Sequence, residues 1–299
     1  MAPARFLFLS VSLAVSSWLP QALAWGAMGH ETVAYIAQNF VSPSTAAFCK
    51  EILGTKNSTS YLASVAPWAD TYRYTEGGEF SSVFHYIDAH DDPPTSCGVE
   101  FERDCPAEGC IVSAIHNYTN LLLDHGTTDA LKLDALRFVI HFIGDIHQPL
   151  HDENLAVGGN DITVTFNGTS QNLHHIWDNN MPEAHAGGDT LATAHAWATR
   201  LTKQIRAGAY SGRAAGWVEG LDIADPHKTA LGWARDANGY VCSTVMEPGL
   251  EYLEGEDLAG EYYLAARPVF EELIARAGVR LAAWLDLIVA SGTGRSEGW

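Results

Sequence analysis

Histidine and aspartate residues recur along this chain at the spacing expected of metal ligands. His141 and Asp145 lie four residues apart in a run that predicts a helix, so both side chains should point the same way. His151 follows shortly after this run, and His174 and Asp178 repeat the four-residue spacing. Imidazole and carboxylate groups together suit zinc, whereas carboxylates alone would suit calcium or magnesium. These residues therefore predict a zinc site.

The remaining histidines differ in how well they fit such a site. A buried His–Asp hydrogen bond could explain the first pair, but it would leave His151 unexplained. At about 100° per residue, His147 should point roughly 240° away from His141, which predicts a place in the core or behind the ligands. His175 is likewise rotated off the face of the second pair and should face solvent or lie behind the ligands. Three earlier candidates stand on separate segments: His30, Asp70 and His85. Six others have no partner at ligand spacing and are expected to be ordinary surface or core residues: His90, His116, His125, His185, His195 and His227.

The elements that must position these residues are mostly helical. Apolar residues recur at three- and four-residue spacing, which is typical of helices. The predicted helices cover residues 27–39, 60–72, 111–124, 130–148, 190–205 and 261–289. Residues 161–166 alternate as a short strand does, and Asn167-Gly168 after them favours a hairpin turn. No internal repeat or long linker divides the chain. The expected fold is a mainly α, single-domain multi-helix bundle with a small β-hairpin.

The first 24 residues predict a secretory signal peptide. Arg5 is followed by an apolar stretch and then by the small-residue cleavage site Ala22-Leu23-Ala24. The alternative is an apolar N-terminal helix of the fold. Cleavage would make Trp25 the mature N-terminus, with a catalytic domain at residues 25–290 and a flexible tail at residues 291–299. The protein is therefore expected to be secreted and extracellular.

Export favours disulfide formation among the five cysteines. Spacing alone suggests a tight Cys105–Cys110 bridge and a long-range Cys97–Cys242 bridge, and it leaves Cys49 as a buried thiol. Three Asn-x-Ser/Thr sequences are glycosylation candidates at Asn57, Asn117 and Asn167.

The chain is strongly acidic. Its formal net charge is −19, from 36 acidic and 17 basic residues. A nucleic-acid-binding protein usually carries a basic footprint, so this balance alone argues against one. The argument weakens if several acidic residues hold cations, because bound ions can reverse the local sign of charge.

Several short motifs together carry a resemblance to a known family. They are Trp25-Gly-x-x-Gly-His30, Trp68-Ala-Asp70-x-x-Arg73, His85-Tyr-Ile-Asp88, His141-x-x-x-Asp145-x-His-Gln-Pro-Leu-His151, Gly158-Gly159-Asn160 and Asn172-Leu-His174-x-x-x-Asp178. In this order, and across the whole mature chain, they resemble the secreted single-strand-specific trinuclear zinc nucleases of the S1/P1 type. That family is related in fold to zinc phospholipase C.

The resemblance implies three zinc ions per chain. The first would be held by Asp70, His85, His141 and Asp145. The second would be held by the α-amino nitrogen and carbonyl oxygen of Trp25, with His30 and Asp145. The third would be held by His151, His174 and Asp178. In the implied mechanism a zinc-activated water attacks phosphorus and the third zinc neutralises the leaving 3′-oxygen, which yields 5′-phosphate products.

The resemblance also implies roles in catalysis and substrate binding. Arg73, together with the ligands Asp70 and Asp145, would form the catalytic set; the alternative for Arg73 is a surface arginine paired with an acidic neighbour. The substrate-binding set would be Tyr86, Asp88, Val157 and Asn179, and the alternative for Tyr86 is core packing. Thr169 stands where relatives can carry a second stacking tyrosine. The implied partners are single-stranded DNA, RNA and nucleotides, and the chain is expected to be a monomer without stable membrane association.

Two other functions fit part of this pattern. A zinc phospholipase C would share the fold and most ligands, but Arg73, Tyr86 and Asp88 favour a nuclease. A non-catalytic zinc protein would use a closed site, usually with cysteine ligands, and this ligand set contains none.

Overall fold

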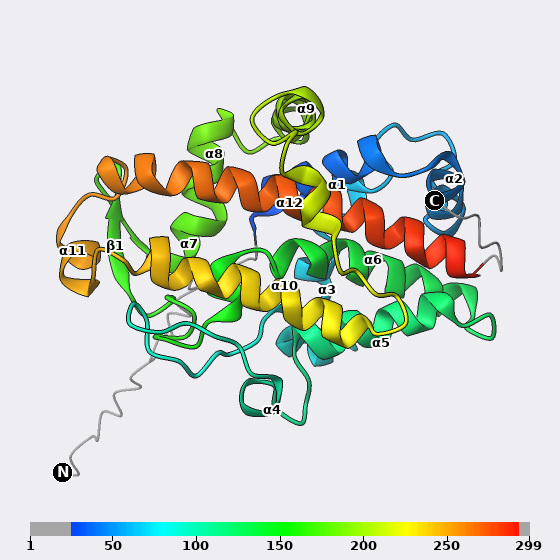
Figure 1. Ribbon diagram of the computed structural model, residues 1–299, viewed down its shortest axis with the longest axis horizontal. Coiled ribbons are helices and arrows are strands. Elements are labelled where there is room, and N and C mark those ends of the chain that lie inside the picture. Colours follow the sequence, from blue (N-terminus) through cyan, green and yellow to red (C-terminus); the bar gives the residue numbers. More distant parts are fainter. Residues whose placement is uncertain (1–24, 293–299) are drawn as a thin grey trace, which may run out of the picture.

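The computed structural model describes residues 25–292 (Figure 1). The predicted signal peptide, residues 1–24, lies outside the described residues, as do residues 293–299. Ser291 and Gly292, the first two residues of the predicted tail, are the last two residues of α12. Both are weak helix formers, but at the final turn the cost of keeping them helical is small.

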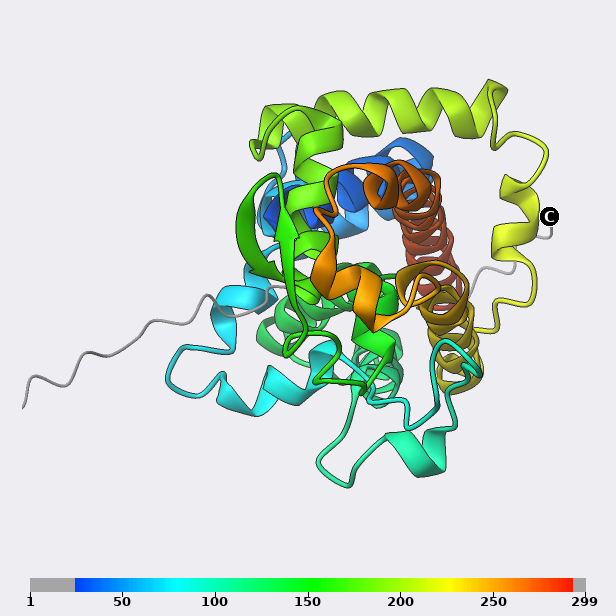
Figure 2. The same cartoon turned by 90° about the vertical axis from the view of Figure 1, so that its left-hand side faces the viewer.

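Six long helices form two connected layers of three helices each. α1 (Ala27–Phe40) packs lengthwise on α12 (Glu261–Gly292), and α9 (Leu191–Ala207) covers α1 from outside. α5 (Ile111–Leu123) pairs with α6 (Asp129–Asp145), and α10 (Pro226–Tyr240) packs on α5. In two perpendicular views α9 lies on one side of the α1–α12 pair, and α5 and α10 lie on the other (Figure 1, Figure 2). This arrangement confirms the predicted mainly α class.

Shorter elements join these helices and carry much of the site. The short helices are α2 (Pro43–Ile52), α3 (Trp68–Tyr72), α4 (Phe101–Asp104), α7 (Leu173–His175), α8 (Met181–Ala186) and α11 (Leu250–Gly255). The 3-10 turns are η1 (Ala63–Val65), η2 (Glu79–His85), η3 (Pro149–Asp152) and η5 (Ala214–Val218). Two π-helical turns, η4 (Ile176–Asn180) and η6 (Val241–Val245), complete the set.

The predicted hairpin is present. β1 (Thr163–Phe166) pairs antiparallel with β2 (Thr169–Asn172), and Phe166 faces Thr169 across the turn. Asn167 and Gly168 have φ values of 51° and 72°, as a two-residue hairpin turn of this hand requires. The strand begins at residue 163 rather than 161.

Two helix predictions need correction, and one long helix was missed. Residues 60–72 contain the separate elements η1 and α3, because Pro67 has no N–H to continue the backbone hydrogen bonds of the first turn. The helix predicted to reach residue 148 ends at Asp145. α10 was not predicted, although Pro226 at its first turn and the Asp225 side chain, which accepts a hydrogen bond from Lys228 N at 3.0 Å, are helix-start signals.

Candidate metal centre and substrate pocket

The carboxylate of Asp145 lies at the centre of the first ligand group. It stands at the end of α6, and its Oδ2 lies 2.9 Å from His85 Nδ1 and 3.1 Å from Nε2 of His141, one turn earlier. Asp70, on α3, adds an oxygen 3.6 Å from the same His141 nitrogen. All four side chains are buried. The structure thus brings together four residues from three separate segments.

The second oxygen of Asp145 faces a different histidine. Its Oδ1 lies 3.0 Å from Nε2 of His30, on α1, and the His30 ring stacks on His141 with centroids 3.9 Å apart. Trp25 is fully buried at the start of α1, and the Gly26 N–H that follows it donates to Asp178 O at 2.9 Å. The two oxygens of one carboxylate therefore face different imidazoles, His85 and His141 at Oδ2 and His30 at Oδ1, as in a bridging metal ligand.

A third group lies at the floor of the neighbouring pocket. The Nε2 atoms of His151, on η3, and His174, on α7, are 3.1 Å apart. Asp178, on η4, places its Oδ2 3.2 Å from His174 Nε2. All three side chains are buried.

Backbone hydrogen bonds select the ligand atom of three histidines. His141 Nδ1 donates to Ala66 O at 2.7 Å, His151 Nδ1 donates to His85 O at 2.7 Å, and His174 Nδ1 donates to Gly158 O at 2.6 Å. A proton on Nδ1 leaves the Nε2 lone pair pointing into the site, which is how proteins prepare neutral imidazole for a metal.

The electrostatics of the first group favour a cation. Burial lowers the pKa of His85 to about 4, so its ring is neutral. Burial opposes protonation of His141 too, but the Asp145 and Asp70 carboxylates outweigh it and raise the pKa of His141 to about 9. Although its own burial acts the other way, His141 and His30 hold the pKa of Asp145 well below its ordinary value. An ionised Asp145 is the form that a metal requires.

Unpartnered polar atoms support metal binding in these groups. Among the described residues, several buried ligand atoms make no hydrogen bond of good geometry, although Asp145 Oδ1 and His30 Nε2 are 3.0 Å apart: both ring nitrogens of His30, Asp70 Oδ1, Asp145 Oδ1 and Asp178 Oδ2. Leaving such atoms buried and unpaired costs about 1–3 kcal/mol each, so atoms that converge in this way point to an ion. The nitrogen and oxygen donor set suits zinc.

His147 and His175, which helix rotation excluded from the predicted ligand set, lie where the sequence predicted. His147 is buried behind the ligands, where its Nδ1 donates to Ile143 O at 2.7 Å and its Nε2 lies 3.0 Å from Arg280 Nη1. His175 is half-buried, with its Nδ1 3.3 Å from Asn179 Nδ2.

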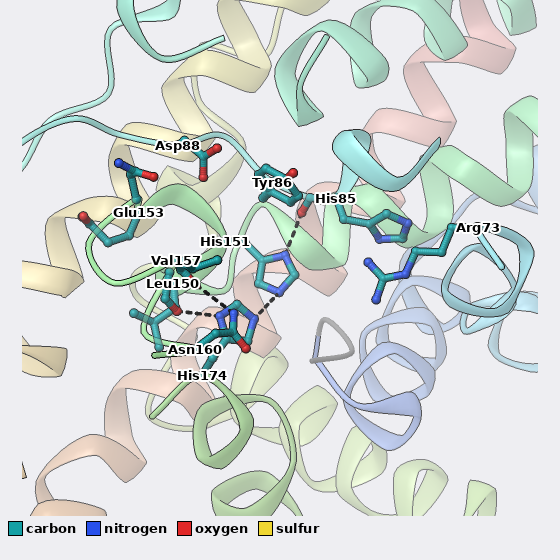
Figure 3. A pocket seen from close by; sticks show the side chains of 12 residues that line it. Arg73, His85, Tyr86, Asp88, Leu150, His151, Glu153, Val157, Asn160 and His174 are labelled. Carbon is teal, nitrogen blue, oxygen red and sulfur yellow. Dashed lines mark hydrogen bonds between the residues drawn. The ribbon is translucent and has the colours of Figure 1, made fainter. Parts of the chain in front are cut away.

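A pocket of about 200 Å³ opens onto the third group. Its lining includes Arg73, Tyr86, Asp88 and Val157 (Figure 3). Arg73 Nη2 lies 3.7 Å from Asp70 Oδ1, so the guanidinium adjoins the first ligand group. Figure 3 shows Arg73 and Val157 on opposite sides of the central histidines. The pocket therefore places a cation, an aromatic face and an apolar wall around the ligands.

Tyr86 and Val157 are available for contact with a ligand. Their side chains are 37% and 62% exposed, which argues against core packing for Tyr86. Asn179, expected in the substrate-binding set, lies beside the N-terminal segment. An added Cβ on Gly26 would come within 1.8 Å of Asn179 Oδ1, so the two residues are in close contact.

The loop that presents Val157 is strained. Ala156 and Val157 have φ values of 50° and 57°, in the left-handed region that β-branched residues rarely adopt. Asn160 Nδ2 donates to Val157 O at 2.8 Å and holds the turn. Strain of about 1–3 kcal/mol per residue persists where surrounding structure enforces it, often at ligand sites.

Several lining residues carried no assigned role at the sequence level. They are Leu150, Glu153, Asn154, Gly158 and Asn160. Leu150, Gly158 and Asn160 belong to motifs already noted, and those motifs were the available signal. Glu153 and Asn154 became visible only when η3 and the following loop folded against η2 and the residues after it.

The covalent features fit an oxidising compartment. Disulfides join Cys97 to Cys242 and Cys105 to Cys110, the pairs that spacing suggested. Cys49 is a buried free thiol. The three sequon asparagines, Asn57, Asn117 and Asn167, are exposed. Within residues 25–292, no helix has the length and apolar character needed to cross a bilayer.

A helical bundle with clustered imidazole and carboxylate ligands, open to a pocket that holds an arginine, defines a metal-dependent hydrolase. The chain belongs to the S1/P1 nuclease family, whose sequence model matches residues 25–290. This confirms the resemblance found in the motifs. The chain is thus a phosphodiesterase of the nuclease class.

Named relatives agree with this assignment. Nuclease S1 of Aspergillus oryzae is 58% identical over 282 residues, covering 94% of this chain and 98% of its own length. Nuclease P1 of Penicillium citrinum is 49% identical over 267 residues, covering 89% and 98%. Endonuclease 2 of Arabidopsis thaliana is 32% identical over 297 residues, covering 93% and 96%.

Proposed function

We propose that this chain is a secreted, monomeric, zinc-dependent endonuclease. It cleaves single-stranded DNA and RNA to 5′-phosphate products and also removes 3′-phosphates from nucleotides. One observation carries the proposal: the two oxygens of Asp145 face different imidazoles, His30 on one side and His85 and His141 on the other, and a further ligand group lies on the floor of the adjoining pocket.

Three ions would account for these ligand atoms. One would be held by Asp70, His85, His141 and Asp145, the second by Trp25, His30 and Asp145, and the third by His151, His174 and Asp178. Zinc bound there would lower the pKa of a coordinated water and neutralise the anionic phosphate. The negative charge of Asp70, Asp145 and Asp178 would then be balanced by metal, which answers the objection raised by the acidic composition.

The pocket side chains bind and orient the substrate. Arg73 offers a planar fork of donors to the non-bridging phosphate oxygens and stabilises charge that develops on them. Tyr86 stacks on a base, Val157 covers the opposite face, and Asp88 accepts hydrogen bonds from the base edge. Burial raises the pKa of Asp88 above its ordinary value, so the pocket favours the protonated form of this carboxyl group more than water does.

This mode of binding selects single strands. A base can enter between Tyr86 and Val157 only when it has left its own stack, and that costs least in a single strand. Stacking accepts any base, so cleavage should have broad sequence tolerance. With a formal net charge of −19, the protein offers little general attraction to a long duplex, and recognition rests on this pocket.

The proposal is tested with secreted protein whose N-terminus is verified as Trp25. Single-stranded and duplex DNA are incubated with and without a zinc chelator, and the products are identified. Release of 5′-mononucleotides, faster from single strands and abolished by chelator, is expected. Cleavage of short-chain lecithin without cleavage of either DNA would instead indicate a phospholipase. Bound zinc without hydrolysis of any phosphoester would indicate a non-catalytic protein.

A further inference from the structure

Gln148 contacts ligand residues of more than one metal group. Its side-chain Nε2 donates to Asp178 Oδ1 at 2.6 Å, and both side chains are fully or almost fully buried. Its backbone N–H donates to Asp145 O at 2.8 Å, and its backbone carbonyl accepts from His151 N at 2.9 Å. One residue therefore bonds to three residues of the ligand set, on three different elements.

The hydrogen bond from Gln148 gives the two oxygens of the Asp178 carboxylate different roles. Oδ1 is occupied by Gln148, whereas Oδ2 has no hydrogen-bond partner among the described residues and lies 3.2 Å from His174 Nε2. The bond thus sets the carboxylate rotation that turns Oδ2 toward His174. The other end of the amide is also used, since Gln148 Oε1 accepts from Leu150 N at 2.6 Å. The amide is held at both ends and has little freedom to turn.

Asp178 needs such support because of its backbone. It lies in the π-helical turn η4, whose geometry differs from that of the α-helix before it. Its carbonyl oxygen also accepts the Gly26 N–H at 2.9 Å, beside Trp25. A shift of Asp178 would therefore affect the third group first and could then reach the N-terminal ligands.

From these contacts we propose that Gln148 is a positioning residue for the third metal ion, acting through Asp178. The inference rests on the proposed three-ion centre. Hydrogen-bonded supports of metal ligands typically contribute 10- to 100-fold in metal affinity. Replacing Gln148 with methionine, which has similar length but neither donor nor oxygen acceptor, should weaken the third ion by that factor and leave the other two in place.

The experiment measures zinc retained per chain at a series of buffered free-zinc concentrations. Wild-type protein is measured first: fewer than three ions would contradict the three-ion proposal itself, before any variant is made. With three ions in the wild type, selective loss of one from Gln148→Met supports the inference. Retention of all three at wild-type affinity, or uniform loss of all three, overturns it.

Two further variants separate positioning from a structural role. Gln38→Met is the matched control, since both ends of the Gln38 amide are also hydrogen-bonded, to Thr59 O at 3.1 Å and Leu62 N at 2.8 Å, away from the metal groups. It should retain three ions. In a double-mutant cycle with Asp178→Ala, Gln148→Met should add little further loss, because the change at Asp178 already removes the carboxylate that Gln148 holds. Additive losses would show that Gln148 does not act through Asp178.

A more conservative substitution covers the case in which Gln148→Met does not fold. In Gln148→Glu the side chain keeps its size and its acceptor for the Leu150 N–H. The variant lacks the amide N–H that Asp178 accepts, so binding of the third ion should again be weakened selectively. Retention of all three ions at wild-type affinity would refute the proposed role.

Discussion

Replacing Gly144 with alanine would place a methyl group against His30, a proposed metal ligand. Gly144 lies on α6 between His141 and Asp145, where α1 approaches closely. A Cβ built at this position would lie 2.7 Å from His30 Nδ1 and 2.9 Å from His30 Cε1, whereas ordinary contact begins at 3.4 Å. His30 would have to move by about 0.7 Å to restore that contact. Metal–ligand distances tolerate only about ±0.2 Å.

The expected result is a folded protein with a damaged second metal site. His30 has little room to move, because it stacks on His141 at 3.9 Å and faces Asp145 Oδ1 at 3.0 Å. A ligand misplaced by this amount can lower the rate by about 100-fold. Alanine is a better helix former than glycine by about 1 kcal/mol, so the fold itself should survive.

The assay combines zinc content, circular dichroism and the rate of single-stranded DNA cleavage. Gly232→Ala is the matched control, since Gly232 lies within α10 and a Cβ there meets no atom within 4 Å. The control should keep full activity and gain up to about 1 kcal/mol of stability. A Gly144→Ala protein with full zinc content and wild-type activity would refute the argument from close packing.

Other predictions concern the N-terminus, the bridging carboxylate, the strained loop and one acidic side chain. A protein that retains a methionine before Trp25 should lose one zinc and most activity, and metal analysis showing no loss would count against the Trp25 assignment. Asp145→Ala should lose two zinc ions together, and loss of only one ion would count against the bridging role of Asp145. Val157→Gly should relieve loop strain of about 1 kcal/mol but raise KM several-fold by removing the wall of the base site, so an unchanged KM in steady-state kinetics would contradict that role. Although burial acts the other way, hydrogen bonds from Arg103 and from backbone N–H groups lower the pKa of Asp104 below its ordinary value of 3.8. The resulting stability is present above that value and is lost as pH falls through the lower folded-state pKa, so Asp104→Asn should cost about 1–3 kcal/mol at pH 7 and less near pH 3. Urea unfolding at the two pH values checks this, and an equal cost at both would oppose it.

Much of the candidate site was predicted from local sequence, and the errors in the helix predictions have local causes. His141 and Asp145 share a helix, so their spacing alone predicted that they point together. The long helix expected over residues 60–72 failed because a proline within it outweighed the apolar pattern. α10 was missed because its buried stripe includes the polar residues Thr229 and Asn238, which weaken the apolar pattern, although its start signals were present.

Residues that act through distant partners could not be found in this way. Gln148 and Asp178 are thirty positions apart, and their contact exists only because η3 and η4 meet beside the pocket. The family resemblance associated Asn179 with substrate binding, but its contact with Gly26 is likewise a tertiary contact that no local pattern predicts.

The sequence by itself determined the helical class, the types of metal ligand and the family, because periodicity, side-chain chemistry and motif order are properties of the chain. The tertiary structure decided which imidazole nitrogen faces the site, which oxygen of Asp178 is available and how close α1 approaches α6. Each of these depends on a backbone or side-chain partner from another element. Such partners are set by packing, which no local pattern encodes.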